Sequence, residues 1–113
     1  MTVYKIIAAD LWKAAEDDGV IMGAGIDLKD GFIHLSTGRQ ARRTAQLYFK
    51  GQDDLVLVAV DEAKLGDALK YEPSRDGDLF PHLYGPLPMV AVLSVRPLLL
   101  GADGSHVFPE DVD

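Results

Sequence analysis

The chain has 113 residues, of which 48% are hydrophobic and 26% are charged, and this is the composition of an ordinary globular protein. The length predicts a single domain over residues 1–113, with its core at about residues 3–100 and an acidic tail at 101–113. Cysteine is absent, which excludes disulfides, thiolate zinc sites and cysteine nucleophiles. The formal net charge of −7 argues against extended nucleic acid as a partner, because such binding requires a basic surface.

Neither a membrane-spanning segment nor a secretion signal is visible in the sequence. No apolar run approaches the roughly 20 residues that are needed to cross a bilayer. Residues 1–20 lack the basic segment followed by an apolar segment that marks a signal peptide. We therefore expect a cytoplasmic protein that has no membrane partner.

The first main helix is predicted directly after an N-terminal strand. Residues 3–8 are expected to form that strand, after which Asp10 is a suitable N-cap and Gly19 a suitable end for the helix. Residues 20–29 are interrupted by glycines and are expected to form an extended, irregular connection. The predicted buried face of the helix consists of Leu11, Ala14 and Ala15.

The second main helix is predicted after a strand at residues 32–35. Thr37 and Gln40 have the Thr-x-x-Gln spacing of a capping box, so the helix should begin there. Gly51 is placed to end it. The predicted buried face of this helix consists of Ala41, Ala45 and Tyr48.

Strands dominate the second half of the chain. Residues 55–60 (LVLVAV) are apolar at every position, which predicts a central strand that is covered on both faces. Residues 61–66 are expected to form one helical turn, residues 69–72 a short strand, and residues 89–95 a last strand that Pro97 ends. These elements predict a small α+β domain with a curved mixed β-sheet and two main helices in its N-terminal half.

The segment at residues 31–37 (GFIHLST) places a histidine and two hydroxyls where a strand ends and a helix begins. In an extended strand, His34 and Ser36 share one face and lie about 7 Å apart. Thr37 and the first turn of the helix offer unpaired N–H groups that suit an anion or phosphate. The alternative interpretation is a half-buried histidine bonded to the backbone, with Ser36 and Thr37 serving only as caps.

Basic residues follow on the same helix. Arg39, Arg42 and Arg43 occupy its first turns, and with Lys5 they could form a small positive pocket in an acidic protein. Such a pocket would suit a single phosphate-bearing ligand. Arg42 or Arg43 would then contact the phosphate.

The segment at residues 80–87 (FPHLYGPL) has two prolines and a glycine, which predict a stiff turn rather than a strand. His82 is a candidate hydrogen-bonding or acid–base group, and Tyr84 a candidate stacking surface or hydroxyl donor. The alternative is a turn whose aromatic rings fill the end of the core. Glu72 is a candidate carboxylate; the alternatives are a solvated side chain or a salt bridge to Arg75.

Three further features weigh less. Trp12 and Tyr4 flank the first strand and helix, where single aromatic residues usually belong to the core. His106 lies in the tail and is uninformative. A metal site built from His34, His82 and a carboxylate is not expected, because no short-range ligand pair such as His-x-His supports it.

The order of several motifs resembles that of a bacterial family known as domain of unknown function 952. The resemblance covers about residues 3–95 and includes two specific motifs, and the family has no established activity. The motifs are residues 3–6 (VYKI), Trp12 with Ala15, residues 31–36 (GFIHLS), residues 55–61 (LVLVAVD), Glu72 and residues 80–85 (FPHLYG).

That family is similar to a compact ADP-ribosyltransferase-like fold and, within it, to the RNA 2′-phosphotransferases, which also place His-Leu-Ser at a strand end before a helix. The resemblance implies a split, curved β-sheet that holds NAD in a cleft. It implies that the first strand contacts the ribose or the nicotinamide amide, through Lys5 here and through histidine in many relatives. His34 and Ser36 would lie near the nicotinamide or a phosphate, and Glu72 would be the third-motif carboxylate.

Three functions remain open at this point. In the first, NAD or an ADP-ribose-like nucleotide binds in a cleft lined by His34 and His82, Tyr84 stacks on a base, and His82 or Glu72 assists transfer. In the second, the two imidazoles serve as base and acid of a two-histidine phosphoesterase, which requires them to lie within about 10 Å of each other. In the third, the chain is a non-catalytic binding or interaction module.

Overall fold

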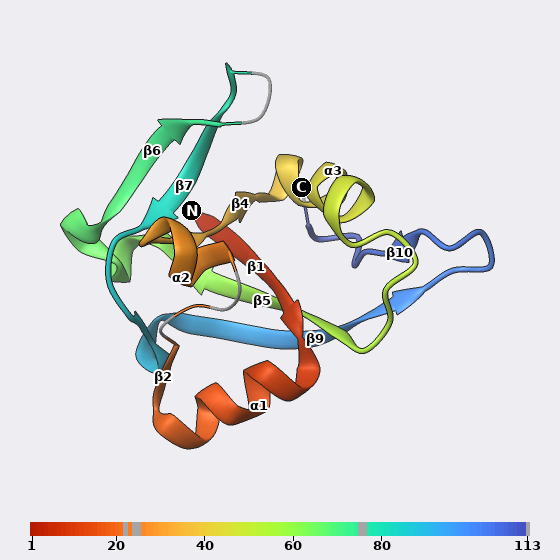
Figure 1. The fold of residues 1–113 in the computed structure, drawn as a ribbon, viewed down its shortest axis with the longest axis horizontal. Helices are drawn as coiled ribbons and strands as arrows, with labels where there is room; N and C mark the ends of the chain where they lie inside the picture. The colour runs from red at the N-terminus through yellow and green to blue at the C-terminus, as the bar shows by residue number, and fades with distance from the viewer. Residues whose placement is uncertain (22, 24–25, 75–76, 113) are drawn as a thin grey trace.

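The computed structural model describes residues 1–21, 23, 26–74 and 77–112, and its ribbon is drawn in Figure 1. Within them lie three α-helices: α1 (Ala9–Asp18), α2 (Ile26–Asp30) and α3 (Gly38–Tyr48). Short 3₁₀ turns cover Glu62–Lys64, Gly66–Ala68 and Met89–Ala91. The strands are β1 (Thr2–Ala8), β2 (Val20–Ile21), β3 (Ile33–His34), β4 (Ser36–Thr37), β5 (Leu55–Asp61), β6 (Leu69–Pro73), β7 (Leu79–Leu83), β8 (Leu87–Pro88), β9 (Val92–Leu100) and β10 (His106–Val107).

The main sheet is a curled, half-barrel sheet of five strands in the order β10-β9-β5-β1-β4. A second sheet has the order β3-β7-β6, and β2 pairs with β8. Every pairing among the described residues is antiparallel, so the predicted mixed sheet is wrong in this respect. For β5 to run parallel to β1, the chain between them would have to return to the start of β1. Instead, β5 begins beside the end of β1, with Leu55 opposite Ala8.

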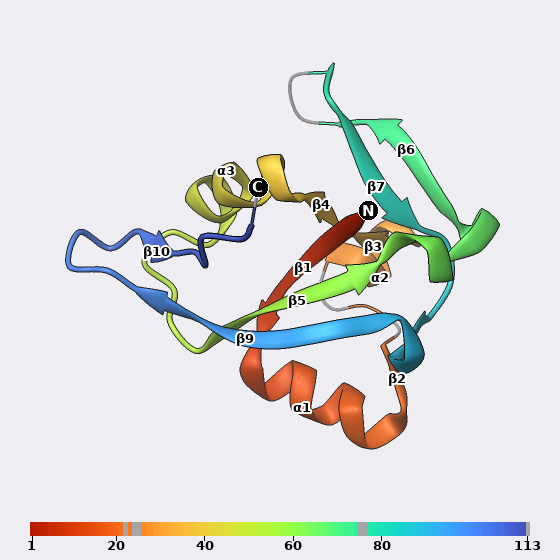
Figure 2. The same ribbon diagram turned by 180° about the vertical axis from the view of Figure 1, so that it is seen from behind.

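The main sheet is covered on both faces (Figures 1 and 2). On one face Trp12 of α1 packs with Val3, Val58 and other residues, and on the other Ala41 of α3 packs in a second cluster. Side chains of a strand alternate between faces, and β5 accordingly supplies buried residues to both clusters. The prediction of a doubly covered strand at residues 55–60 is confirmed.

The two predicted main helices are present, with corrections to their details. In α3 the capping box of Thr37 and Gln40 is confirmed and Ala41 and Ala45 are buried, but Tyr48 is 65% exposed. The N-cap of α1 is Ala8, one position before the start, so Asp10 lies in the first turn instead. The buried residue of α1 is Trp12, as expected of a core aromatic, and not Leu11.

Two segments with prolines form strands that the sequence analysis shortened or missed. The segment at 80–87 was predicted as a turn, yet its first half belongs to β7, the central strand of its sheet. Pro81 is tolerated there because its carbonyl accepts from Leu35 N–H, so its nitrogen faces the point where β3 has ended. The last strand begins at Val92 and continues through Pro97. On the side away from β5, β10 pairs only with Leu99 and Leu100 of β9, so Pro97 lies on an edge where a missing N–H is tolerated.

The segment after residue 100 is packed against the body of the molecule. β10 pairs with the end of β9, and Val112 is 1% exposed in the cluster beneath α3. The side chain of Arg42 donates to the carbonyl of Val112 at 2.7 Å. None of the described helices has the length and apolar character needed to cross a membrane.

Candidate functional site

Two motifs that lie about 50 residues apart meet where β3 pairs with β7. His34 faces His82 directly in the register of these two strands. Around them gather polar side chains from β1, α2 and β6, together with the residue that follows β7. We call the group the imidazole cluster; its members are Lys5, Asp27, Phe32, His34, Glu72, His82 and Tyr84.

Asp27 is the innermost member of the imidazole cluster, with a side chain that is 0% exposed. Its Oδ2 accepts from Lys5 Nζ at 2.7 Å. Its Oδ1 accepts from the backbone N–H of His34 at 2.9 Å and lies 2.6 Å from His34 Nδ1. Gly23 makes room for this carboxylate, because a Cβ at that position would lie 2.7 Å from the Asp27 Cβ.

Burial alone would raise the pKa of Asp27, but the hydrogen bonds from His34 and the charge of Lys5 outweigh it and hold the pKa well below its usual range. The carboxylate is therefore ionised, and Lys5 is the cation that compensates it. The Lys5 ammonium also lies 3.2 Å from the carbonyl oxygen of His34. Lys5 is 8% exposed, so it supports the site from behind and does not line its surface.

His34 is held by carboxylates at both ring nitrogens. Nδ1 faces Asp27, and Nε2 lies 3.2 Å from an oxygen of Asp30 at the end of α2. The side chain is 30% exposed. His34 is thus oriented from inside by Asp27 and presents its Nε2 edge toward solvent.

The second carboxylate, Glu72, is bound by two groups from the neighbouring segment. Its Oε1 lies 2.9 Å from His82 Nδ1 and accepts from the Tyr84 hydroxyl at 2.7 Å. These hydrogen bonds, that of Tyr84 first, lower the pKa of Glu72, and the same contact raises the pKa of Tyr84. Glu72 is therefore an ionised carboxylate with fixed orientation, and its side chain is 35% exposed.

The rings of the cluster pack against one another. The centroids of His34 and His82 are 5.5 Å apart with an edge-on arrangement. Phe32 lies 4.6 Å from His34, 4.2 Å from His82 and 5.1 Å from Tyr84. The side chain of His82 is only 6% exposed. A cleft lined by both imidazoles would require both to reach solvent, so the two rings lie together but only His34 is open to it.

The other predicted site residues lie elsewhere. Ser36 pairs with Tyr4 in the main sheet, and its hydroxyl lies 3.2 Å from that of Thr44. The expected single strand is interrupted at Leu35, which separates Ser36 from the sheet that holds His34. The hydroxyl of Ser36 therefore faces α3 and does not belong to the imidazole cluster.

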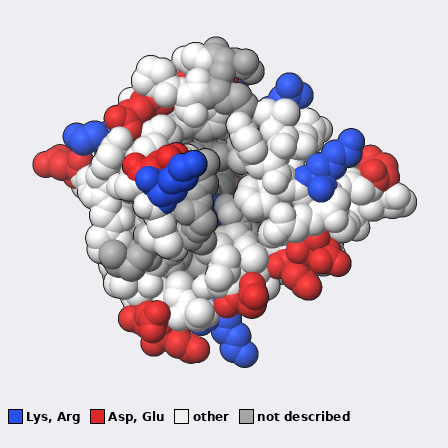
Figure 3. Space-filling model, in the orientation of Figure 1, with Lys and Arg blue, Asp and Glu red and all other residues white. Residues whose placement is uncertain are grey.

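The four basic residues of the predicted positive pocket, which are Lys5, Arg39, Arg42 and Arg43, do not come together, and Arg39 lies at the start of α3. Lys5 is bound in the imidazole cluster, whereas Arg42 donates to the C-terminal segment and lies over the ring of Phe108 at 5.3 Å. Arg43 is exposed on α3. Figure 3 shows charged side chains mainly toward the edge of one face, with acidic ones gathered over α1.

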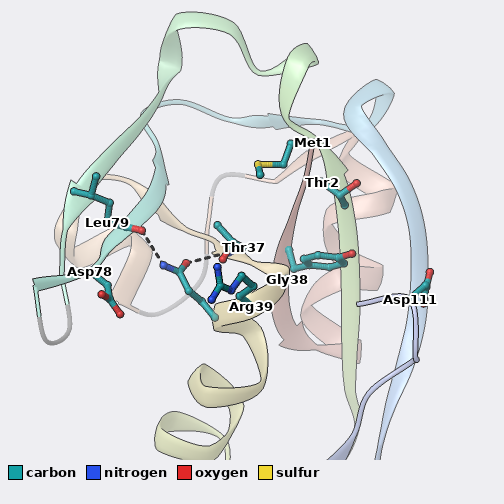
Figure 4. Close-up of a pocket in the computed structure, with 10 residues that line it drawn as sticks. Met1, Thr2, Thr37, Gly38, Arg39, Asp78, Leu79 and Asp111 are labelled. Atoms are coloured by element: carbon teal, nitrogen blue, oxygen red, sulfur yellow. Dashed lines mark hydrogen bonds between the residues drawn. The ribbon is translucent and has the colours of Figure 1, made fainter. Parts of the chain in front are cut away.

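A cavity of about 740 Å³ lies between the start of α3, the start of β1 and the start of β7 (Figure 4). We call it the β1–α3 cavity. Thr37 lines it, whereas the imidazole cluster contributes none of its members. Its lining includes Tyr4, Thr37, Gly38, Arg39, Gln40 and Leu79.

The residues that orient His34 were not predicted from the sequence. Asp27 and Asp30 lie in or next to the segment predicted as an irregular connection, where α2 forms instead. Phe32 stands within the motif of His34, but nothing in the motif indicated that it would cover His82. Arg75, the predicted partner of Glu72, lies outside the described residues. Among the described residues, no group of three or more His, Cys, Asp or Glu side chains is arranged to hold a metal ion.

Comparison with known proteins places this architecture. The crystal structure of CC0527 from Caulobacter crescentus is similar to this structure, with a TM-score of 0.91 and 48% sequence identity. The match covers 95% of this chain and 94% of CC0527. The solution NMR structure of CC0527 gives 49% identity and a TM-score of 0.83, over 92% of this chain and 90% of that one. None of the curated proteins is a match. Residues 6–95 match the model of a family described as "Protein of unknown function (DUF952)", and the chain therefore belongs to the DUF952 family.

Proposed function

We propose that the imidazole cluster binds a small nucleotide-like ligand, NAD or ADP-ribose, and that the fold is a compact relative of the ADP-ribosyltransferase fold. One observation carries the proposal. His34 and His82 lie 5.5 Å apart, and each is bonded by a carboxylate from a different element. Polar groups that converge in fixed orientations beside an aromatic surface are the usual sign of a ligand site.

The groups that reach solvent match the parts of a nucleotide. The ionised Glu72 carboxylate can accept hydrogen bonds from ribose hydroxyls, and His34, whose Nδ1–H donates to Asp27, can accept at Nε2 from a ribose hydroxyl or an amide N–H. Tyr84 is 41% exposed and lies beside Phe32, so this pair offers a surface on which a base or nicotinamide ring stacks. His82 orients Glu72 from the buried side.

The architecture is consistent with the resemblance noted in the sequence. A curled five-stranded sheet and a separate three-stranded sheet correspond to the split, curved sheet that the ADP-ribosyltransferase-like fold implies. The imidazole cluster lies where α2 and the three-stranded sheet meet β1. The resemblance thus favours NAD over other nucleotides.

Lys5 favours ligand binding without transfer. Its ammonium is bonded to Asp27 and to the carbonyl of His34, so it is not free to contact the ribose or the nicotinamide as the resemblance implies. Transfer is the second candidate function, and the ionised, hydrogen-bonded Glu72 favours it. A carboxylate in this state can stabilise positive charge that develops on a ribose.

The two-histidine phosphoesterase has less support. The imidazole separation of 5.5 Å meets its distance requirement. However, the hydroxyl of Ser36 is bonded to Thr44 and His82 is buried, so only one imidazole is accessible to a phosphate.

Calorimetric titration with NAD and with ADP-ribose tests the proposal. We expect saturable heat at or below millimolar ligand, lost in His34→Ala and retained in the matched control His106→Ala. His106 lies in β10 and bonds to the carbonyl of Gln52, away from the cluster. Absence of heat at millimolar concentrations of both ligands would overturn the proposal. Release of nicotinamide from NAD, followed by chromatography, separates transfer from binding.

A further inference from the structure

The hairpin of β6 and β7 projects from the main sheet (Figure 1), and its outer part extends past the end of β3. β3 pairs with β7 as far as His82, and the N–H of Leu35 then donates to the carbonyl of Pro81 at 3.0 Å. Beyond that point, residues 72–74 and 78–80 pair with each other as a two-stranded ribbon, which we call the outer hairpin. An isolated two-stranded hairpin is marginally stable in water, so the outer hairpin depends on its attachments to the body of the protein.

One attachment of the outer hairpin is apolar packing. Phe80 pairs with Glu72 in the register of β6 and β7 and is 6% exposed. Its neighbour Leu79 is 54% exposed, and the β1–α3 cavity separates this part of the hairpin from β1. Packing at one residue fixes the place of the outer hairpin, but a second contact is needed to fix its orientation.

The second attachment is a hydrogen bond from the start of α3. The side-chain amide of Gln40 donates from Nε2 to the carbonyl of Leu79 at 2.8 Å (Figure 4). Gln40 lies in the first turn of α3, and Thr37, which precedes this helix, pairs with Val3 of the main sheet. The bond therefore ties the outer hairpin to the main sheet through α3.

The residue type at position 40 agrees with this second role. The Oε1 of Gln40 accepts from the N–H of Thr37 at 3.1 Å, which completes the capping box. Glutamate serves this position of a capping box as glutamine does, and the positive end of the helix dipole stabilises its charge. A carboxylate cannot donate to a carbonyl, so the bond to Leu79 is the one that requires an amide.

The outer hairpin carries Glu72, whereas His34 lies on β3. The position of the outward carboxylate relative to the outward imidazole therefore depends on the orientation of the outer hairpin. We infer that Gln40 is a positioning residue, which holds Glu72 in place relative to His34 and thereby sets the ligand affinity of the imidazole cluster. The effect on affinity rests on the proposed function of the cluster, whereas the effect on the outer hairpin does not depend on it.

Gln40→Glu separates the two bonds of this side chain, because a carboxylate still accepts from Thr37 but cannot donate to Leu79. Amide hydrogen exchange of ¹⁵N-labelled protein measures the effect on the outer hairpin, where the N–H of Ser74 is bonded to the carbonyl of Asp78. This N–H should exchange about three- to tenfold faster in the variant, because opening the outer hairpin no longer breaks the bond to Leu79. The amides of α3 should change less than about twofold, because the capping box is retained.

Calorimetric titration with NAD measures the effect on the ligand. We expect Gln40→Glu to weaken NAD binding about threefold or more, because part of the binding energy is used to orient the outer hairpin. The matched control is Gln46→Glu, which makes the same change at an exposed position of the same helix. It should change neither the exchange of Ser74 nor the affinity for NAD by more than about twofold.

Unchanged exchange of Ser74 in Gln40→Glu, or equal acceleration in Gln46→Glu, would overturn the inference. Faster exchange of Ser74 with unchanged affinity for NAD would also overturn the positioning role, and the proposed function would stand. Absence of NAD binding by the protein without substitutions would overturn the proposed function instead. The exchange of Ser74 would then decide by itself whether Gln40 holds the outer hairpin.

Discussion

The imidazole cluster contains two carboxylate–histidine pairs that lie side by side and have opposite orientations. In the pair of Asp27 and His34, the carboxylate is 0% exposed and the imidazole 30% exposed. In the pair of Glu72 and His82, the imidazole is 6% exposed and the carboxylate 35% exposed. One pair therefore directs an imidazole outward, and the other directs a carboxylate outward.

The difference in burial determines what each pair needs for stability. A carboxylate removed from water must be paired, and Asp27 is compensated by Lys5 and by two N–H donors of His34. An imidazole can be buried as a neutral ring, and His82 needs only its bond to Glu72 and the cover of Phe32. Loss of a partner should therefore destabilise the protein more in the pair of Asp27 and His34 than in the pair of Glu72 and His82.

The two orientations also change the roles that the sequence suggested. Equivalent roles for the two histidines would require equal access, which they do not have. In the proposed function, His34, Glu72 and Tyr84 contact the ligand, and His82 positions Glu72. Substitutions in each pair test this difference in burial.

The largest effect is expected from Lys5→Met, which leaves the buried Asp27 carboxylate without its cation. We expect the free energy of unfolding, measured with urea, to fall by about 3–5 kcal/mol, a large part of the stability of a small domain. The double variant Lys5→Met/Asp27→Asn removes both charges, keeps an acceptor oxygen for the N–H groups of His34, and should recover at least half of the loss. A cost below about 1 kcal/mol for the single variant would show that the pair is not buried in solution.

Acid should destabilise the protein through Asp27. Its pKa in the folded state lies below the unfolded value of about 3.9, so its contribution to stability is complete above that value. The contribution is lost as the pH falls below about 4 toward the folded pKa. Urea midpoints between pH 6 and pH 2 should therefore decline less steeply in Asp27→Asn than in the unmodified chain. Parallel curves for the two proteins would contradict the assignment.

Phe32→Ala should remove the difference in access between the two imidazoles. The Phe32 ring lies 4.2 Å from that of His82, so its removal exposes His82 to reagents. Modification by diethyl pyrocarbonate is located by peptide mass spectrometry. The reaction at His82 should be slow in the protein without the substitution and at least about tenfold faster in Phe32→Ala, because access limits the reaction. His106 provides the internal control, since its rate should not change. Equal rates at His34 and His82 before the substitution would refute the comparison.

Local signals in the sequence predicted one part of the structure well. The capping box at Thr37 and Gln40, the continuous apolar run at 55–60 and the glycine after α1 each depend on a few adjacent residues. The pattern for Tyr48 was equally local and failed, because burial depends on which side of the helix meets the sheet.

Long-range pairing is what the sequence could not supply. His34 and His82 were both identified as candidates, but their contact arises from the register of β3 on β7, which adjacent residues do not specify. Pro81 appeared to exclude a strand, and the exclusion failed because β3 ends where its nitrogen points. Asp27 was missed because a carboxylate in a glycine-rich segment resembles any exposed one until its partners, Lys5 and His34, are placed in space.

Tyr84→Phe should give the smallest effect and the finest test of the exposed pair. The hydrogen bond from Tyr84 is the largest cause of the lowered pKa of Glu72, so its loss should raise that pKa toward the usual value while the bond to His82 keeps the rise incomplete. The side-chain carboxyl ¹³C resonance of Glu72, followed between pH 2 and pH 7, measures the change. Tyr71→Phe is the matched control, because Tyr71 on the same strand bonds to Glu62 instead, and it should leave the titration of Glu72 unchanged. An unchanged pKa in Tyr84→Phe would mean that the outward carboxylate is held by His82 alone, and Tyr84 would then be free to turn toward a ligand.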